Sequence, residues 1–363
     1  MKILTGIDLP FKPNCGSMIL VNDLYSDLPK DVSVRFLALS PSTPKNWSSI
    51  KDVHLLKIDK VTDPKEYKPY LKLLSDEIKK QVADFKPDLI HIQHLSFGMA
   101  LEFAKLSLPK VAICHGTDIQ YSLLSDFHKQ NMFNIYNKSD EVVFPTKRIF
   151  DEFVKLTHLT EKSVIIPWGL PDKAFSGGLK KILKKGNSIL YAGRLDSNKN
   201  VDMIIDSLKH VDPKIHLTII GEGDQKDLLI KKVSKLGFQN RVKFEDFKPR
   251  QELWKEFSKF DAIVVSTKTI EAFCLMAIEA QAHGLPLIYA RTNGLMDVIG
   301  SSGIGFNPNS TVDLTNAINK ITQSYDLRKE YSRKGLKNSE KYKIAETRKR
   351  FLEVSQQVLN NHE

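Results

Sequence analysis

The sequence contains few cysteines and no long apolar segment. Its three cysteines, Cys15, Cys114 and Cys274, are spread over 363 residues, a pattern that fits neither a disulfide framework nor a CxxC metal motif. No segment approaches the roughly 20 apolar residues of a membrane-spanning helix, and the apolar run at the N-terminus is too short for a signal peptide. We therefore expect a cytoplasmic protein that is neither exported nor inserted in a membrane, and we expect no metal site.

Low-complexity sequence is also absent, because 18 glycines and 16 prolines in 363 residues are ordinary numbers. Hydrophobic residues make up 41% and charged residues 27% of the chain, as in soluble globular proteins. A chain of 363 residues exceeds what one hydrophobic core usually organises. Two folded domains are therefore expected.

Basic residues are concentrated near the C-terminus. The net charge is +11, and between residues 328 and 350 ten basic residues meet three acidic ones. Two interpretations stay open: the solvated face of a helix, which is the commoner meaning of a charge run, or a surface for an anionic membrane or another polyanion. Nucleic acid is not favoured, because aromatic residues are not interleaved as a stacking platform requires. In the first half a local lysine cluster consists of Lys65, Lys68, Lys72, Lys79 and Lys80.

Short apolar, β-branched runs alternate with amphipathic helical stretches along the chain, which predicts βαβ units with buried parallel strands. The expected strands are 2–7, 32–39, 88–93, 110–115, 141–145 and 163–167 in the first half, and 188–192, 216–220, 241–244, 261–266, 286–290 and 303–306 in the second. The clearest helix is 67–85, where apolar residues recur at helical spacing. The predicted fold class is α/β, with two Rossmann-like, doubly wound domains facing each other across a cleft.

A break in this pattern predicts the domain boundary. Residues 168–178 are rich in Gly and Pro, and a polar, lysine-rich stretch follows to residue 187, which is typical of a linker. We expect a Rossmann-like domain over 1–168, a linker over 169–187, a second Rossmann-like domain over 188–340, and a C-terminal helix over 341–363 that packs back toward the first domain. Ligands of open α/β sheets bind beyond the carboxyl ends of the strands, so we expect the functional site there.

Two cations follow the predicted strand 188–192. Arg194 and Lys199 lie in the turn before a helix that we expect to begin near Asn200. A guanidinium binds phosphate oxygens bidentately and an ammonium adds a mobile point charge, so the pair suits a diphosphate. The alternative is ordinary surface charge on a loop, since Lys and Arg are usually exposed.

Two carboxylates lie in the segment 269–284, which follows the predicted strand 261–266. A helix that begins within this segment would present free backbone N–H groups and a positive dipole end, and would form an anion site near residues 273–276. Glu271 would precede the helix and Glu279 would lie within it, so the two can bind different hydroxyls of one ligand. Paired carboxylates also suit glycoside hydrolysis, and a Glu at a helix start can simply complement the dipole. The adjoining anion site favours a phosphorylated ligand.

Four segments, in this order, resemble the donor domain of family-4 retaining glycosyltransferases of the GT-B type. They are residues 191–199 (YAGRLDSNK), 219–223 (IIGEG), 241–244 (RVKF) and 271–284 (EAFCLMAIEAQAHG). Weaker matches are residues 115–118 (HGTD) and 167–175 (PWGLPDKAF), the latter similar to the interdomain segment of that family. The resemblance is strong over residues 188–300 and weaker over the first half.

The resemblance implies a role for each matching residue. Arg194 and Lys199 would bind the donor diphosphate, Glu271 the hydroxyls of the donor sugar and Glu279 the ribose, while His115 is similar to an active-site histidine that touches the sugar. The implied catalytic residues are His115, Arg194, Lys199 and Glu271. The implied donor-binding residues are Gly16, Gly193, Arg194, Lys199, Phe244, Glu271, Phe273, Cys274, Leu275, Met276 and Glu279, with the backbone of Leu275 and Met276 at the distal phosphate and Phe244 near the nucleobase.

The implied reaction is transfer of a hexosyl unit with retention at the anomeric carbon. The donor would be a nucleoside-diphosphate sugar, with UDP-hexose favoured and GDP-mannose next. The acceptor would be a hydroxyl of a glycan, a lipid-linked glycan or a small molecule, bound by the first domain. No metal or cofactor is implied, because cations and a helix terminus can stabilise the departing diphosphate. Peripheral contact with the inner face of an anionic membrane stays open.

Two other classes also stay open. The first is a non-catalytic sugar-nucleotide or carbohydrate-binding protein, or a partner subunit, with the same fold. The second is a GT-B sugar-nucleotide epimerase.

Several positions depart from the family pattern. Cys274 and Asn200 stand where the family usually has glycine, as does Asp246, and Trp168 replaces an asparagine. The N-terminal loop at residues 14–17 (NCGS) lacks the usual paired glycines. A Cβ at position 274 is expected to narrow the approach of a phosphate to the backbone. None of these departures removes a charged donor contact.

Overall fold

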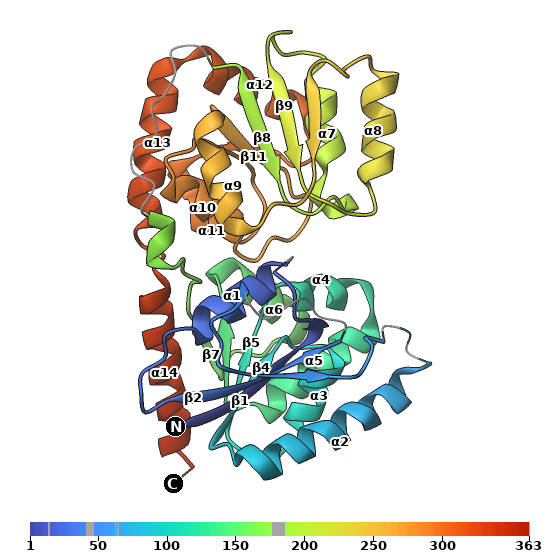
Figure 1. Cartoon of the computed structure of the whole chain (residues 1–363), viewed down its shortest axis with the longest axis vertical. Helices are drawn as coiled ribbons and strands as arrows, with labels where there is room; N and C mark the ends of the chain where they lie inside the picture. The colour runs from blue at the N-terminus through green and yellow to red at the C-terminus, as the bar shows by residue number, and fades with distance from the viewer. Residues whose placement is uncertain (14, 41–46, 62, 64, 176–185, 363) are drawn as a thin grey trace. The chain divides into compact units, whose positions relative to one another are not determined.

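The computed structural model describes residues 1–13, 15–40, 47–61, 63, 65–175 and 186–362. The chain divides into two compact units (Figure 1). Unit 1 consists of Met1–Trp168 and Ile344–Glu363, and unit 2 of Gly169–Lys343. Residues 176–185 of the predicted linker and Asn14 of the N-terminal loop lie outside the described residues.

Unit 1 contains a seven-stranded, all-parallel sheet in the order β3-β2-β1-β4-β5-β6-β7. Its strands are β1 (Lys2–Pro10), β2 (Ser33–Leu39), β3 (Asp52–Leu56), β4 (Leu89–Gln93), β5 (Lys110–Ile113), β6 (Glu141–Phe144) and β7 (Ser163–Ile165). Six of these strands match the predicted ones. β3 was not predicted, because among the described residues this short edge strand pairs with β2 alone and buries two of its five side chains.

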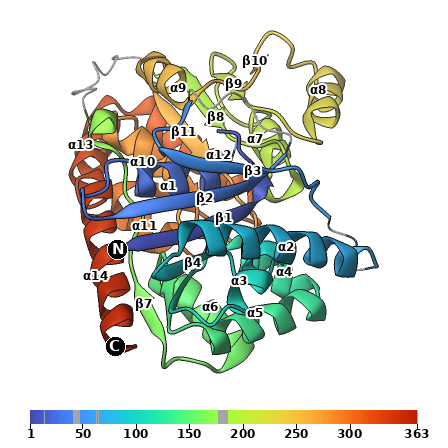
Figure 2. The same cartoon turned by 60° about the horizontal axis from the view of Figure 1, so that its bottom comes forward.

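Helices surround this sheet. They are α1 (Gly16–Tyr25), α2 (Tyr67–Phe85), α3 (Gly98–Ala104), α4 (Thr117–Leu124), α5 (Asp126–Lys138), α6 (Lys147–Thr157) and α14 (Ile344–Asn360). The bounds of α2 are those predicted, and the helix ends at Lys86 in the left-handed conformation. Figure 2 shows α2, α3 and α5 together beside β1 and β4, whereas α14 packs against α1.

Unit 2 contains a six-stranded parallel sheet in the order β10-β9-β8-β11-β12-β13. Its strands, all predicted with ends that differ by one residue at most, are β8 (Ser188–Ala192), β9 (His216–Ile220), β10 (Val242–Glu245), β11 (Ala262–Val265), β12 (Leu287–Ala290) and β13 (Ile304–Phe306). Its helices are α7 (Val201–Ser207), α8 (Lys226–Lys235), α9 (Arg250–Glu256), α10 (Leu275–Ala282), α11 (Leu295–Ile299), α12 (Thr311–Gln323) and α13 (Tyr325–Ser339).

The strand order locates the place where a ligand can bind in each unit. In a doubly wound sheet the crevice opens where the direction of winding reverses, beyond the carboxyl ends of the two central strands. In unit 2 these strands are β8 and β11. The segments that follow them begin at Gly193 and Ser266 and contain both predicted motifs.

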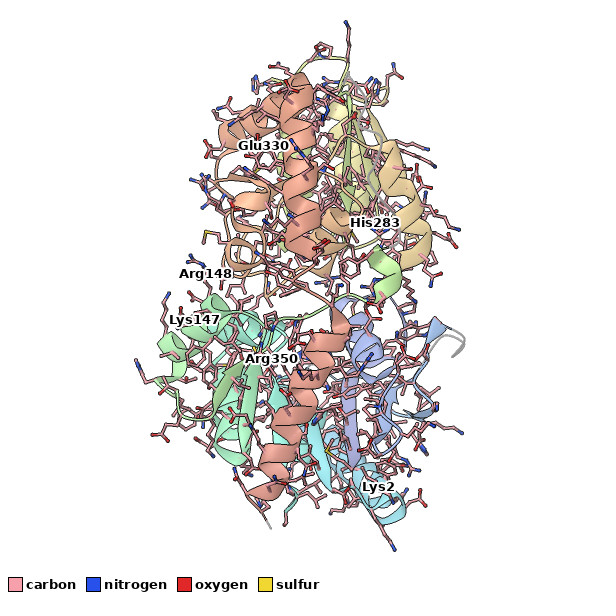
Figure 3. All side chains as sticks on the ribbon, turned by 90° about the vertical axis from the view of Figure 1, so that its left-hand side faces the viewer. Lys2, Lys147, Arg148, His283, Glu330 and Arg350 are labelled. Atoms are coloured by element: carbon pink, nitrogen blue, oxygen red, sulfur yellow. The ribbon has the colours of Figure 1, made fainter. Side chains whose placement is uncertain are left out.

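The basic segment 328–350 is divided between two helices and two units. Arg328 on α13 is fully buried, and its guanidinium donates to the carbonyls of Ile321 and Thr322 at the end of α12. In unit 1, Arg348 donates to the carbonyl of Leu24 at the end of α1. Arg350, labelled on α14 in Figure 3, donates to the carbonyl of Ile165. Cations at helix carboxyl ends are stabilising, so part of this charge serves the fold and is neither a solvated face nor a polyanion surface.

Within the described part of the chain, no helix has the length and apolar character needed to cross a bilayer.

Candidate functional site

Lys199 and Glu271 meet where the loops after β8 and β11 come together in unit 2. Lys199 Nζ lies 2.5 Å from Glu271 Oε2. Thr267 Oγ1 donates to the same carboxylate oxygen at 3.0 Å, and Ser266 Oγ donates to the Lys199 carbonyl at 2.5 Å. The side chains of Lys199 and Glu271 remain 21% and 16% exposed, so a ligand can reach both.

Electrostatics keep Lys199 charged. Burial opposes the positive charge, but the neighbouring Glu271 outweighs it and raises the pKa of the ammonium above its ordinary value. Local backbone structure fixes the position of Lys199, because Asp196 caps the 3-10 turn Ser197–Lys199 by accepting from the backbone N–H groups of Asn198 and Lys199. The site therefore offers an oriented cation beside an oriented carboxylate.

Arg194 lies in the same loop and is more exposed than Lys199. Its side chain is 63% exposed and lies 3.2 Å from Asp196. Tyr191 fixes the backbone here, since its hydroxyl donates to the Arg194 carbonyl at 2.6 Å. Close backbone packing requires glycine at the facing position 221, because a Cβ there would lie only 1.9 Å from the Gly193 carbonyl oxygen. The guanidinium can thus turn toward an anion while its backbone stays fixed.

The predicted helix start is the N-terminus of α10. The first backbone N–H groups of a helix have no intrahelical acceptor, so those of Leu275 and Met276 are available to an anion. Phe273 is buried and packs edge-on against Tyr342, with ring centroids 5.3 Å apart. Its aromatic ring therefore belongs to the core, and only its backbone can take part in donor binding.

Two departures from the family pattern have one conformational explanation. Cys274 and Asn200 both adopt left-handed backbone conformations, with φ of 66° and 54°. Glycine is the least strained residue in this region, and Asn tolerates it better than most. Each position thus keeps the backbone conformation that favours glycine although it carries a side chain. Burial raises the pKa of the Cys274 thiol to about 12, and Glu271 adds to the effect, so Cys274 is a neutral thiol.

Glu279 is buried in unit 2 and has partners on α9. Arg250 Nε donates to Glu279 Oε1 at 2.6 Å, and Trp254 Nε1 donates to Glu279 Oε2 at 2.9 Å. The Arg250 guanidinium also lies over the Trp254 ring, 5.1 Å from its centroid. A carboxylate has about four lone-pair positions, more than these two hydrogen bonds use. Glu271 and Glu279 have separate partners, which is unlike a paired acid and base.

The other predicted donor residues have simpler surroundings. Phe244 on β10 is partly buried against the core of unit 2. Gly16 is the first residue of α1, and a Cβ there would meet nothing within 4 Å, so sterics do not require glycine. Asp246 is exposed and lies 2.6 Å from Lys226 Nζ. In the described ranges, no group of three or more His, Cys, Asp or Glu residues is arranged to hold a metal.

His115 lies in unit 1, directly beyond β5, and is buried. Its Nε2 lies 2.8 Å from Gln93 Oε1, and its ring centroid lies 4.3 Å from that of His94. Burial lowers the pKa of His115 well below its ordinary value, with a smaller contribution from His94, so the imidazole is neutral. Trp168 packs nearby, with its ring centroid 6.2 Å from that of His115.

The partners of His115 were not among the predicted site residues, although Asp118 lies in the matched segment 115–118. Asp118 accepts from the backbone N–H groups of Leu95 and His115, at 2.7 and 2.9 Å. Burial opposes its charge, but His94 outweighs burial and lowers the pKa of Asp118. A signal was present in the sequence: β4 (LIHIQ) is fully buried, yet it carries polar residues at alternate positions, His91 and Gln93. Polar side chains on one face of a buried strand indicate a hydrogen-bonded network.

Family models match both halves of the chain. The model described as Glycosyltransferase Family 4 matches residues 20–173, and the model described as Glycosyl transferases group 1 matches residues 179–338. The chain belongs to the family-4 GT-B glycosyltransferases. Arg194, Lys199, Glu271 and Glu279 all lie in the part that matches the second model, and His115 in the part that matches the first.

Three glycosyltransferases of low sequence identity are similar to this chain. An uncharacterized glycosyltransferase of Methanocaldococcus jannaschii is 28% identical over 269 residues, which are 70% of this chain and 71% of that protein. The amylovoran biosynthesis glycosyltransferase AmsK of Erwinia amylovora is 24% identical over 58% of this chain and 55% of its own length. The glycogen synthase of Mycobacterium tuberculosis is 25% identical over 65% of this chain and 60% of its own length.

Solved glycosyltransferase structures share the fold over nearly the full length. The sucrose-phosphate synthase from Thermosynechococcus elongatus has a TM-score of 0.86 at 17% identity, over 99% of this chain and 100% of that one. Anabaena HepE in complex with UDP-glucose has a TM-score of 0.80 at 18% identity, over 98% of this chain and 99% of that one. At these identities the likeness establishes the GT-B fold.

Proposed function

We propose that this glycosyltransferase is a retaining hexosyltransferase that uses a nucleoside-diphosphate hexose, with UDP-hexose favoured and GDP-mannose next. The acceptor is a hydroxyl of a glycan, a lipid-linked glycan or a small molecule. The observation that carries the proposal is the Lys199–Glu271 pair, a partly exposed cation and carboxylate 2.5 Å apart at the switch point of the second sheet. The solved HepE structures with UDP and UDP-glucose add support for a uridine donor.

Each part of the donor has a matching group in unit 2. Arg194 and Lys199 bind the diphosphate, and the N-terminus of α10 at Leu275 and Met276 binds its distal phosphate. Glu271 accepts hydrogen bonds from the sugar hydroxyls, and the remaining lone pairs of Glu279 accept from the ribose. The backbone near Phe244 borders the nucleobase. We assign to His115 the contact with the donor sugar that its resemblance to the family's active-site histidine implies.

The chemical step needs stabilisation of the departing diphosphate. As the glycosidic bond breaks, positive charge develops on the sugar and negative charge on the phosphate oxygens. The backbone and the Glu271 contact hold Lys199 in place, and the fold holds the α10 terminus, so these two groups need little reorganisation in the transition state, whereas the exposed Arg194 side chain turns toward the same negative charge. The leaving phosphate accepts the proton of the acceptor hydroxyl as the new bond forms on the same face. Cys274 is a neutral thiol and takes no covalent part, and no metal ion or cofactor is required.

Nucleotide release distinguishes this function from the two alternatives. The purified chain is incubated with UDP-glucose, UDP-galactose, UDP-N-acetylglucosamine and GDP-mannose, and free UDP or GDP is measured with and without candidate acceptors. A transferase releases the nucleotide diphosphate from at least one donor. Binding without release from any donor would leave a non-catalytic sugar-nucleotide protein. Interconversion of one UDP-sugar into another without an acceptor would identify an epimerase.

Contact with an anionic membrane is a second part of the proposal, and it concerns the acceptor. The cluster Lys65, Lys68, Lys72, Lys79 and Lys80 is exposed on and beside α2. Exposed apolar residues accompany it in unit 1, among them Leu73 on α2 at 55% exposure and Leu124 on α4 at 81%. Basic and apolar groups together bind anionic bilayers, and salt weakens the electrostatic part.

Sedimentation with vesicles tests this contact. Vesicles of phosphatidylcholine with phosphatidylglycerol are expected to bind the chain at low salt and release most of it at high salt, whereas pure phosphatidylcholine vesicles bind little. Equal, salt-independent sedimentation with both kinds, or none with either, argues for an acceptor in solution.

A further inference from the structure

Five buried polar side chains of unit 1 form a hydrogen-bonded series that ends on His115. Ser355 Oγ on α14 lies 2.8 Å from His91 Nε2, and His91 Nδ1 lies 2.8 Å from the Tyr25 hydroxyl. Gln93 Nε2 lies 2.9 Å from that hydroxyl, and Gln93 Oε1 lies 2.8 Å from His115 Nε2. All five side chains are buried. The proposed donor site uses only the last of them.

The protons of this series have one consistent arrangement. Gln93 donates its two amide hydrogens to Thr5 Oγ1, at 3.1 Å, and to Tyr25. Tyr25 then donates to His91 Nδ1, so the proton of His91 lies on Nε2 and is donated to Ser355. Thr5 and Ser355 donate in turn to the backbone carbonyls of His91 and Phe351, at 2.8 and 2.7 Å. Each hydrogen is used once.

If the Gln93 amide is turned the opposite way, the hydrogens no longer suffice for all the observed hydrogen bonds. Thr5 would have to donate its single hydroxyl hydrogen both to Gln93 and to the His91 carbonyl. Tyr25 would donate to the Gln93 oxygen, so His91 would have to donate to Tyr25 from Nδ1. Burial lowers the pKa of His91 to about 3 and keeps it neutral, so its Nε2 would then have to accept from Ser355. Ser355 would then have to donate one hydrogen both to His91 and to the Phe351 carbonyl. The Gln93 amide oxygen therefore faces His115.

An amide oxygen only accepts hydrogen bonds, so His115 Nε2 must carry the proton. A neutral imidazole then has its lone pair on Nδ1. No residue in the described part of the chain is hydrogen-bonded to this nitrogen. The imidazole of His115 thus offers a hydrogen-bond acceptor, Nδ1, to its surroundings, while its ring N–H already donates to Gln93.

We propose that Gln93 is a positioning residue that holds His115 in the Nε2–H form. His115 Nδ1 then accepts a hydrogen bond from a hydroxyl of the donor sugar, a contact that rests on the proposed function. Tyr25, His91 and Ser355 hold the Gln93 amide in the required orientation. The C-terminal helix α14 therefore supports a donor contact through Ser355. It gives a second support through Phe351, because the ring of Trp168 packs near those of both His115 and Phe351, at centroid distances of 6.2 and 5.7 Å.

The tautomer of His115 is measured by long-range proton–nitrogen NMR on the full chain labelled at its histidine rings. The signal of His115 is assigned by its loss in His115→Gln. The wild-type chain is expected to show one neutral form with the proton on Nε2. In Gln93→Met the acceptor for Nε2 is lost, so both tautomers are expected, with a fall of about tenfold in donor turnover because a sugar hydrogen bond is weakened.

A second variant gives a readout that mere packing would not change. Gln93→Glu keeps an oxygen beside His115 Nε2 but makes it a carboxylate, which favours the imidazolium form. As the pH falls, Nδ1 gains a proton and can no longer accept from the sugar. Turnover of Gln93→Glu is therefore expected to fall on the acid side, in a range where the wild-type rate is flat.

The far end of the series supplies a matched pair of variants. Ser355→Ala removes the partner of His91 and is expected to shift the His115 tautomer in the same direction as Gln93→Met, to a smaller extent. Ser139→Ala is the control, because Ser139 is also fully buried and also donates to the carbonyl four residues before it, at 2.7 Å. Ser139 lies outside the series, so its variant is expected to keep the wild-type tautomer.

Two results would overturn the inference: a wild-type His115 with its proton on Nδ1, or a folded Gln93→Met chain with unchanged tautomer and turnover. The proposed function can fail separately. If the wild-type chain cleaves no nucleotide sugar, the NMR spectra of the wild type and Gln93→Met still decide whether Gln93 sets the tautomer.

Discussion

Lys199 Nζ lies 2.5 Å from Glu271 Oε2 and so joins the loops that follow β8 and β11, although the two residues are 72 positions apart in the chain. The pair orients both groups before any ligand arrives. In the proposed mechanism each then acts on a different part of the donor, the ammonium on the diphosphate and the carboxylate on the sugar.

Replacing either member of this pair is expected to abolish transfer while the fold remains intact. Glu271→Ala or Lys199→Ala should lower kcat/KM by at least about a hundredfold, because an oriented charge at the transition state is lost. The unpaired partner stays partly buried, so we expect a loss of about 1–3 kcal/mol in the free energy of unfolding. Lys209→Ala is the control, since Lys209 is paired with Asp206 at 2.8 Å on the surface of unit 2. Near-normal turnover of either site variant would remove the donor-site assignment.

Gly294 is expected to hold Glu271 in place. It has φ of 57°, and a Cβ there would lie 1.9 Å from the Glu271 carbonyl oxygen. Gly294→Ala should therefore displace the Glu271 loop and reduce turnover by more than about tenfold. Gly237→Ala is a matched control, because Gly237 has φ of 70° but open space around its Cβ position. Both variants carry the cost of a left-handed alanine, about 1–2 kcal/mol. Equal activity losses in the two would show that strain alone, and not contact with Glu271, is responsible.

Cys274→Gly is expected to be tolerated, with turnover within about threefold of the wild type. Glycine removes the strain of a left-handed Cys, which offsets its greater flexibility in the unfolded chain. Cys274→Val carries a β-branched side chain at φ of 66° and should unfold at lower denaturant concentration, with a loss of about 1–2 kcal/mol. If both Cys274→Gly and Cys274→Ala lost activity, the thiol itself would have a role in the reaction.

The stability of the chain is expected to fall as the pH decreases below about 6.5, partly because of His91. The pKa of His91 is lowered to about 3 in the folded chain, so the unfolded chain binds a proton first. The contribution of His91 to the free energy of unfolding is present in full above its pKa in the unfolded chain, about 6.5. It is lost as the pH falls below that value, by about 1.4 kcal/mol per pH unit, or about 2 kcal/mol at pH 5. Chemical denaturation between pH 7 and pH 5 measures this slope.

His91→Gln should show a shallower slope by about that amount, whereas His216→Gln, at an exposed position, should keep the wild-type slope. An unchanged slope in His91→Gln would mean that the buried imidazole does not resist protonation.

Most of the sheet architecture followed from local patterns. Buried parallel strands are short apolar runs, so all six strands of unit 2 and six of the seven in unit 1 could be predicted. The edge strand β3 was missed because the polar, half-buried residues Asp52 and His54 interrupt the apolar pattern. A run of charge indicates exposure, so the burial of Arg328 at the end of α12 could not be foreseen.

The site itself was only partly predictable. The sequence motifs indicated which residues form it, but their partners depend on tertiary contacts. Glu279 is held by Arg250 and Trp254, which are 29 and 25 residues away in the chain. The left-handed conformation of Cys274 follows from the backbone path into α10, and a cysteine gives no sign of it. His115 is held by Gln93 and indirectly by Ser355 on the C-terminal helix, a connection that only the fold creates.

The most direct test of the central claim follows the anomeric carbon of the donor. UDP-α-glucose, UDP-α-galactose and GDP-α-mannose are each incubated with the wild-type chain and with Glu271→Ala, and early proton NMR spectra record the released or transferred hexose. The account predicts that at least one donor gives its nucleotide diphosphate together with an α-configured product, and that Glu271→Ala gives neither. A β-configured product at early times, or the same release from Glu271→Ala, would contradict it.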